Sequence, residues 1–204
     1  SLLALSRRSG STQWVEQAIK CAEHLMKNRN PRDGQWTSAA FGMPLTGFAH
    51  GAAGMALAMS KLYRVTSDER YRAAALVAVD FENIYFDKAL KNWLDLRPTE
   101  VNGPLRSPDQ WCYGATGIGL ARSAMLEDRT VSSEALLEDI ARSIDHVCSS
   151  SSKTDSLCCG TAGKIEMLGA LASYLPYVDT LTTMKAKLFE LEDRWSSVKD
   201  FRWN

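Results

Sequence analysis

The chain has 204 residues, enough for one domain of ordinary size with a sizeable hydrophobic core. Lysine plus arginine and aspartate plus glutamate are equal at 24 each, so no broad electrostatic field indicates a nucleic-acid or membrane partner. No apolar run approaches the length of a membrane span, and the apolar start is too short for a signal peptide. We therefore expect a single domain over residues 1–204, and the lack of an initiator methionine suggests a piece of a longer protein.

The number of cysteines indicates whether they are oxidised, and therefore in which compartment the protein is found. There are five of them, Cys21, Cys112, Cys148, Cys158 and Cys159. An odd count without an export signal argues against a disulfide framework. The adjacent cysteines could bridge each other only through a strained ring. We therefore expect reduced thiols in a cytoplasmic protein, which leaves metal binding or catalysis open.

Apolar residues recur at helical spacing along most of the chain. Helices are predicted over residues 12–29, 51–63, 71–86, 117–127, 133–148, 163–175 and 180–195. The clean alternation that is typical of strands is missing. Turn-forming residues cluster at 30–34, 97–108 and 149–154. The fold is therefore predicted to be all-α.

A short motif occurs three times and decides the predicted architecture. It consists of a polar or reactive residue, then Gly-x-x-Gly, then an apolar helix, at residues 50–54, 113–117 and 159–163. The first glycines are 63 and 46 residues apart, which is long enough for one helix out and one helix back. Such helical hairpins, with the turn always on the same side, would stack into an arc or ring. The residues before the glycines would then gather at one end of it.

The glycines have a physical role at the point where each loop enters a helix. Glycine permits positive φ there and lets backbones pack closely. A helix N-terminus also presents free N–H groups and the positive end of the helix dipole, which stabilise a thiolate and lower its pKa. Three such termini facing one another predict a metal or anion pocket.

Cys112, Cys158 and Cys159 are candidate ligands of a zinc ion (Zn2+) whose fourth position is open to a substrate. Cys112 and Cys158 occupy equivalent positions in two of the repeats, which favours this interpretation. The spacing alone leaves an alternative open, because it contains no CxxC pair. The cysteines could instead be small buried apolar residues.

His50 stands at the motif position that Tyr113 and Cys159 occupy in the other repeats. A histidine there could transfer a proton beside the metal, or it could be a capping or core residue. Tyr113 could hydrogen-bond a substrate or an enolate oxygen, or it could be a buried aromatic residue. The residues outside the motif are interpreted as structural or as bystanders: His24, His146, Cys21 and Cys148.

Charged residues lie in or near the loop that leads to Cys112. They are Asp95, Arg97, Arg106 and Asp109. Any of them could orient a group of the site, but we expect solvated loop charges. Trp111 and the segment 93–97 could line a cleft or belong to the core.

Three segments resemble the lanthipeptide cyclase family, most closely the cyclase domain of class II lanthipeptide synthetases. They are 47–54, 111–122 and 157–163, and the stretch 81–97 is also similar. The resemblance implies an α/α toroid of nested helical hairpins with zinc at the centre of one face. By motif position the ligands would be Cys112, Cys158 and Cys159. Most relatives have histidine where Cys159 stands, so the chain resembles the three-cysteine zinc subgroup.

The resemblance also implies an activity. It is the Michael-type addition of peptide cysteine thiols to dehydroalanine or dehydrobutyrine, which forms lanthionine and methyllanthionine thioether rings. His50 matches the histidine that the family uses in proton transfer, and Tyr113 carries over as an active-site residue. The implied partners are a dehydrated precursor peptide and a dehydratase domain in the parent protein. Nothing after residue 163 resembles the final glycine-rich helix of the family, so we expect a partial domain or open arc.

Two other functions stay open at this point. The first is a non-catalytic scaffold that uses the same arc to bind a peptide or a partner. The second is a different α/α enzyme, such as a glycosidase, which needs paired carboxylates at the mouth of the toroid. None of the repeat positions supplies a carboxylate, so the glycosidase is the weaker alternative.

Overall fold

The computed structural model describes residues 1–97, 105–129, 133–172, 174 and 180–198. Its elements are α1 (Leu2–Ser9), α2 (Gln13–Lys27), α3 (Ala52–Thr66), α4 (Glu69–Ile84), β1 (Phe86–Asp87), β2 (Asn92–Trp93), α5 (Ala115–Glu127), α6 (Ser133–Ser149), α7 (Thr161–Leu171) and α8 (Thr180–Val198). The all-α prediction is confirmed, and each predicted helix is present with shifted ends. The predicted end at residue 175 and part of the predicted turn 97–108 lie outside the described residues. Within the described part, no helix has the length and apolarity that a bilayer span requires.

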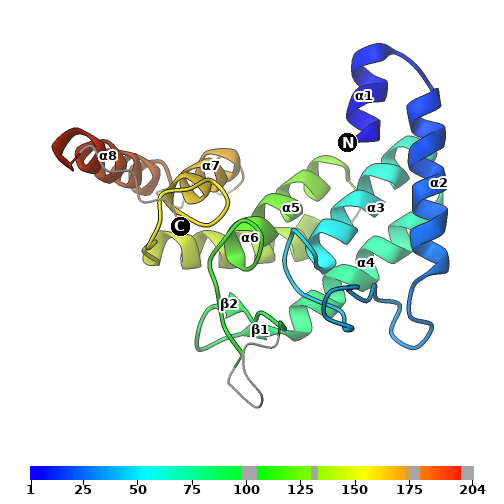
Figure 1. The fold of residues 1–204 in the computed structure, drawn as a ribbon, viewed down its shortest axis with the longest axis horizontal. Helices are drawn as coiled ribbons and strands as arrows, with labels where there is room; N and C mark the ends of the chain where they lie inside the picture. Colours follow the sequence, from blue (N-terminus) through cyan, green and yellow to red (C-terminus); the bar gives the residue numbers. More distant parts are fainter. Residues whose placement is uncertain (98–104, 130–132, 173, 175–179, 199–204) are drawn as a thin grey trace.

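The helices form an open arc of antiparallel pairs (Figure 1). α1 packs on α2, α3 on α4, α5 on α6 and α7 on α8. α3 also contacts α5, and α5 contacts α7, so these three helices form a continuous row. α1 and α2 lie at one end of the arc and α8 lies at the other (Figure 1). The row places the N-termini of α3, α5 and α7, where the three motifs stand, in succession.

Small residues allow the helices of this row to be buried on more than one face. α5 has nine buried residues among its 13, and Ala53 and Ala56 of α3 are fully buried. A Cβ atom at Gly119 of α5 would lie 2.8 Å from Cβ of Ser143 in α6 and 2.9 Å from Cε of Met167 in α7. Glycine at this position therefore lets α5 approach both neighbours.

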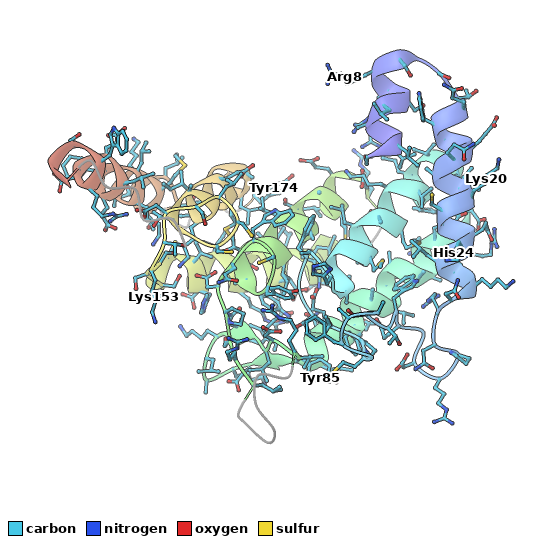
Figure 2. All side chains as sticks on the ribbon, in the orientation of Figure 1. Arg8, Lys20, His24, Tyr85, Lys153 and Tyr174 are labelled. Carbon is cyan, nitrogen blue, oxygen red and sulfur yellow. The ribbon has the colours of Figure 1, made fainter. Side chains whose placement is uncertain are left out.

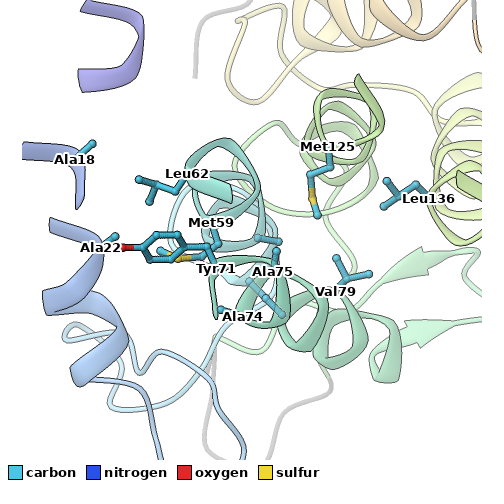
Figure 3. Close-up of a cluster of buried hydrophobic side chains, with 13 residues drawn as sticks. Ala18, Ala22, Met59, Leu62, Tyr71, Ala74, Ala75, Val79, Met125 and Leu136 are labelled. Atoms are coloured by element: carbon cyan, nitrogen blue, oxygen red, sulfur yellow. The ribbon is translucent and has the colours of Figure 1, made fainter. Parts of the chain in front are cut away.

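Apolar side chains form two clusters along the arc. The first lies mainly between α2, α3 and α4, and Figure 3 shows Met59 and Tyr71 in it, with Met125 and Leu136 at its far side. The second joins α5, α6 and α7 and includes Ile140. Each helical hairpin thus buries its apolar residues against its neighbours, which is the packing of a repeat fold.

A buried ion network crosses the arc at Arg122 of α5. This guanidinium lies 2.8 Å from the carboxylate of Glu82 in α4 and 2.9 Å from that of Asp139 in α6, and all three side chains are buried. Glu82 also accepts a hydrogen bond of 2.6 Å from the backbone N–H of Gly47. Burial opposes the charge on Arg122, but the two carboxylates outweigh it and raise the pKa of Arg122. The network therefore ties three helices to the loop that precedes α3.

Replacing Arg122 by leucine should destabilise the protein strongly. The change leaves Glu82 buried without its cation and leaves Asp139 with Arg142 alone, and breaking a buried pair in this way costs about 3–5 kcal/mol. The exposed pair of Arg72 and Glu69 offers a control, because Arg72→Leu should cost less than about 1 kcal/mol. Urea unfolding measures both values, and equal losses would contradict the role assigned to the network.

Candidate metal centre

The three repeated loops fold back over the first turns of their helices in the same way. The second glycine of each motif lies against the carbonyl oxygen of the residue six positions earlier. A Cβ atom there would lie 2.2, 1.8 and 2.2 Å from that oxygen at Gly54 (against Phe48), Gly117 (against Trp111) and Gly163 (against Leu157). No real side chain tolerates such distances, so the fold of the loop itself requires glycine at these positions.

The first glycine of each motif is also enclosed, but only one of the three needs positive φ. Gly114 has a φ of 96°, whereas Gly51 and Gly160 have extended backbones with φ of −122° and −138°. The prediction of close backbone packing is confirmed for all three, with a Cβ 1.8 to 2.4 Å from a carbonyl oxygen. The prediction of positive φ is wrong for Gly51 and Gly160, because these loops enter their helices through the β region.

Backbone hydrogen bonds join successive loops in the same register. The N–H of Phe48 donates to the carbonyl oxygen of Cys112, and the N–H of Trp111 donates to that of Cys158, both at 2.9 Å. Phe48 and Trp111 hold equivalent motif positions, as do Cys112 and Cys158. The rings of Phe48 and Trp111 also pack with centroids 4.8 Å apart. This ladder brings residues that are far apart in sequence to one site.

The three sulfur atoms of Cys112, Cys158 and Cys159 lie within 4.8 Å of one another. Sγ of Cys158 is 3.6 Å from Sγ of Cys112 and 3.2 Å from Sγ of Cys159, and none of the three forms a disulfide within the described part of the chain. A tetrahedral zinc ion with bonds of about 2.3 Å holds its sulfur ligands roughly 3.8 Å apart. The donor set therefore fits one such ion, and the exposed Cys158 leaves the cluster open to solvent.

The surroundings of Cys112 oppose ionisation of its thiol. Burial raises the pKa of the Cys112 thiol to about 12, and the neighbouring Cys158 and Cys159 add to the increase. The expectation that this pKa falls is therefore wrong for Cys112, because its thiol is buried beside two other thiols. Three thiolates at this spacing would repel one another unless a positive ion lay among them. Thiolate ligands select soft or borderline metals such as zinc.

His50 and Tyr113 lie next to each other, and Tyr113 directly follows Cys112 in the chain. Their ring centroids are 6.4 Å apart, and His50 is exposed whereas Tyr113 is buried. The guanidinium carbon of Arg97 lies 3.4 Å from the centroid of the Tyr113 ring. Burial raises the pKa of Tyr113, although the charge of Arg97 opposes the shift. The phenol is therefore protonated at neutral pH and can donate a hydrogen bond.

Two carboxylates that were expected to be solvated are held in ion pairs inside the loop. Asp95 is 2% exposed and lies 2.6 Å from the guanidinium of Arg97. Asp109 lies 2.7 Å from the ammonium of Lys164 in α7 and accepts a hydrogen bond of 2.7 Å from the hydroxyl of Thr116. Although burial opposes ionisation, Lys164 and the hydroxyl donors hold the pKa of Asp109 below its usual range. The prediction of solvated charges is therefore wrong for these two residues.

Asn92 organises the loop before Cys112, and sequence analysis missed it. Its side-chain oxygen accepts a hydrogen bond of 2.9 Å from the N–H of Ala115, the first residue of α5. Its amide donates to the carbonyl oxygen of Pro108 at 2.9 Å. Asn92 is fully buried in β2, which pairs with β1 in a hairpin that the sequence pattern did not predict. The sequence offered one indication of its role, because Asn92 stands beside Trp93 in the stretch 81–97 that resembles the cyclase family.

The remaining cysteines and histidines lie apart from the thiol cluster. Cys21 and His24 are exposed on α2, and Cys148 packs against the second apolar cluster. His146 of α6 lies 3.7 Å from the carboxylate of Asp109. Within the described part of the chain, none of these four belongs to a group that could hold a metal ion.

The sequence matches the family described as Lanthionine synthetase C-like protein over residues 1–194, so the chain belongs to this family. Among solved structures, one named nisin cyclase has a similar fold, with a TM-score of 0.59 at 16% sequence identity. The similarity covers 76% of this chain and 41% of that chain, so the chain spans less than half of nisin cyclase. The prediction of a partial α/α toroid is confirmed. No curated protein matches the sequence.

Gly117→Ala should disturb the metal centre through the backbone. The new methyl group would lie 1.8 Å from the carbonyl oxygen of Trp111, so the loop that carries Cys112 must move. We expect a loss of about 2 kcal/mol or more in urea unfolding, together with weaker zinc binding. Gly169→Ala in α7 is the matched control, because the nearest atom is the flexible sulfur of Met184 at 3.3 Å. Equal stability and zinc affinity in the two variants would contradict the assigned role of Gly117.

Proposed function

We propose that the chain is part of a zinc-dependent cyclase that closes thioether rings in a dehydrated precursor peptide. The reaction adds a peptide cysteine thiol to dehydroalanine or dehydrobutyrine and yields lanthionine or methyllanthionine. One observation carries the proposal. Three sulfur atoms lie within 4.8 Å of one another in a chain of the Lanthionine synthetase C-like family.

Cys112, Cys158 and Cys159 would hold the zinc ion. Structural zinc sites are normally closed by four protein ligands, so three thiolates leave the fourth tetrahedral position for a substrate. Bound zinc would keep the incoming thiol ionised at neutral pH. Three anionic ligands donate more electron density than two thiolates and an imidazole do, which favours a more nucleophilic substrate sulfur. The exposure of Cys158 supports access from solvent.

His50 would deliver the proton that completes the addition. The new carbon–sulfur bond forms at the β-carbon of the alkene, and the electron pair moves into an enolate at the α-carbon. That carbon then needs a proton, and an imidazole exchanges protons readily near neutral pH. His50 is exposed and lies beside Tyr113, whose phenol would donate a hydrogen bond to the enolate oxygen.

The chemistry implies partners of a defined kind. The alkene must be made from serine or threonine before the ring can close, so a dehydratase domain in the parent protein is the expected partner. The assignment to class II synthetases rests on the motif resemblance between residues 47 and 163. A cytoplasmic location suits three thiols that must stay reduced.

Cys159→Ala removes one of three ligands and should abolish both zinc retention and ring closure. Cys21→Ala is the matched control, because Cys21 is exposed on α2, outside the thiol cluster, and both properties should survive. Metal content is measured by atomic emission. Ring closure is measured as the loss of free thiol, at unchanged mass, in a peptide dehydrated beforehand.

Removal of the metal from the unaltered chain gives the complementary result. A chelator should stop ring closure, and added zinc should restore it. Undiminished, stereochemically uniform ring closure without bound metal would refute the proposal. Stoichiometric zinc that stays inaccessible to added thiols would instead favour the non-catalytic peptide-binding scaffold.

His50→Asn should separate binding of the thiol from the chemistry. We expect unchanged zinc content and unchanged binding of a cysteine peptide, because His50 is not one of the sulfur ligands. Ring closure at saturating peptide should slow by about 100-fold or more, since general acid catalysis contributes on that order. An unchanged rate would show that the α-carbon takes its proton from elsewhere.

A further inference from the structure

A cleft with a volume of about 550 Å³ opens beside the thiol cluster. One wall comes from residues 106–110, which precede Cys112, and another from residues 151–154, which precede Cys158. Cys159 lies in the lining, so the cleft is continuous with the proposed metal site. A peptide whose thiol reaches the cluster would therefore place its neighbouring residues in this cleft.

The charges in the cleft do not cancel. Its two acidic residues are both neutralised, Asp95 by Arg97 at 2.6 Å and Asp109 by Lys164 at 2.7 Å. Two further cations, Arg106 and Lys153, line the cleft and are exposed. Neither side chain has a hydrogen-bond or ion-pair partner among the residues that the structure describes. The cleft therefore presents two positive charges that the described protein groups leave unbalanced.

Two hydroxyl groups of the lining are also unmatched. The side-chain oxygens of Ser107 and Ser152 are buried and have no hydrogen-bond partner within the described part of the chain. Most buried polar atoms in proteins have such a partner. A hydroxyl donates well to an ionised oxygen, and so do a guanidinium and an ammonium. The two exposed cations thus favour an anionic oxygen as ligand, and the hydroxyls, which are buried in the wall of the cleft, are further donors suited to the same kind of group.

We propose that this cleft binds a carboxylate of the peptide substrate and that Arg106 and Lys153 select it. The carboxylate comes from an aspartate or glutamate near the reacting cysteine or from the end of the peptide. Carboxylates are the anionic groups of a peptide that carries no phosphate, on aspartate, on glutamate and at the C-terminus, so a carboxylate is the ligand that such a substrate would bring to Arg106 and Lys153. The inference rests on the proposed function, since the position of Cys159 makes the occupant a cysteine peptide.

Binding of short synthetic peptides tests the inference without ring closure. The probes are blocked at both ends and carry either Glu or Gln next to cysteine, and calorimetry measures their affinity for the zinc-loaded chain. We expect the Glu peptide to bind about fivefold more tightly at low salt, with a smaller difference at high salt. The double variant R106Q/K153Q should lose this preference and bind the Gln peptide as before.

A matched double variant controls for net charge. R8Q/K20Q removes one arginine and one lysine that are exposed on α1 and α2, and Figure 2 shows both far from Lys153. This variant should keep the preference for Glu. Equal affinities of the Glu and Gln peptides for the unaltered chain, or a preference that survives in R106Q/K153Q, would overturn the inference. Tighter binding of a phosphoserine peptide than of the Glu peptide would overturn its assignment to a carboxylate.

Two more peptides separate the remaining possibilities. A Gln peptide with a free C-terminus shows whether the chain end supplies the carboxylate, since its affinity then rises to that of the Glu peptide. A Glu peptide with serine in place of cysteine should bind more weakly but keep its advantage over the matching Gln peptide. If it binds as tightly as the cysteine peptide, the thiol site of the proposed function fails while the carboxylate cleft stands.

Discussion

The thiol site depends on one repeated contact, the approach of a glycine to the carbonyl oxygen six residues before it. This contact folds each loop across the first turn of its helix and fixes where the residues before the glycine lie. Because it recurs at Gly54, Gly117 and Gly163, the three loops have the same form and can hydrogen-bond to one another in register. The sulfur atoms therefore meet where the packing of the backbone places them.

Buried polar groups fix the three loops to the helices beneath them. Asn92 fixes the loop before Cys112 to the start of α5, and Glu82 fixes the loop before α3 to Arg122. Asp109 ties the same Cys112 loop to α7 through Lys164. Such groups are costly to bury alone but direct the chain to one arrangement when each finds its partners. The site is therefore open toward solvent and rigidly supported on its inner side.

The repeated motif made the cysteine cluster predictable. Cys112 and Cys158 hold the same position in two repeats, and repeats that fold alike bring such residues to the same end of the arc. The β hairpin, the ion pair of Asp109 and the pKa of Cys112 could not be predicted from the motif. The hairpin that carries Asn92 has two-residue strands, too short for an alternating pattern. Asp109 looked like a solvated charge because its cation, Lys164, lies in the next repeat. The direction of the Cys112 pKa shift depends on burial, which local sequence does not reveal.

The positions of the three cysteines determine which helices a bound metal ion would stabilise against unfolding. Cys112 precedes α5, and the other two ligands precede α7, so all three sulfurs belong to the second and third repeats. In a fold whose repeats touch only their neighbours, ligand binding stabilises the units that supply the ligands. The hairpin of α3 and α4 supplies none of the three sulfurs, so it would gain from metal only through its contacts with the second repeat, which include the hydrogen bond from Phe48 to Cys112. Metal loading should thus stabilise α5 to α8 more than it stabilises the helices before them.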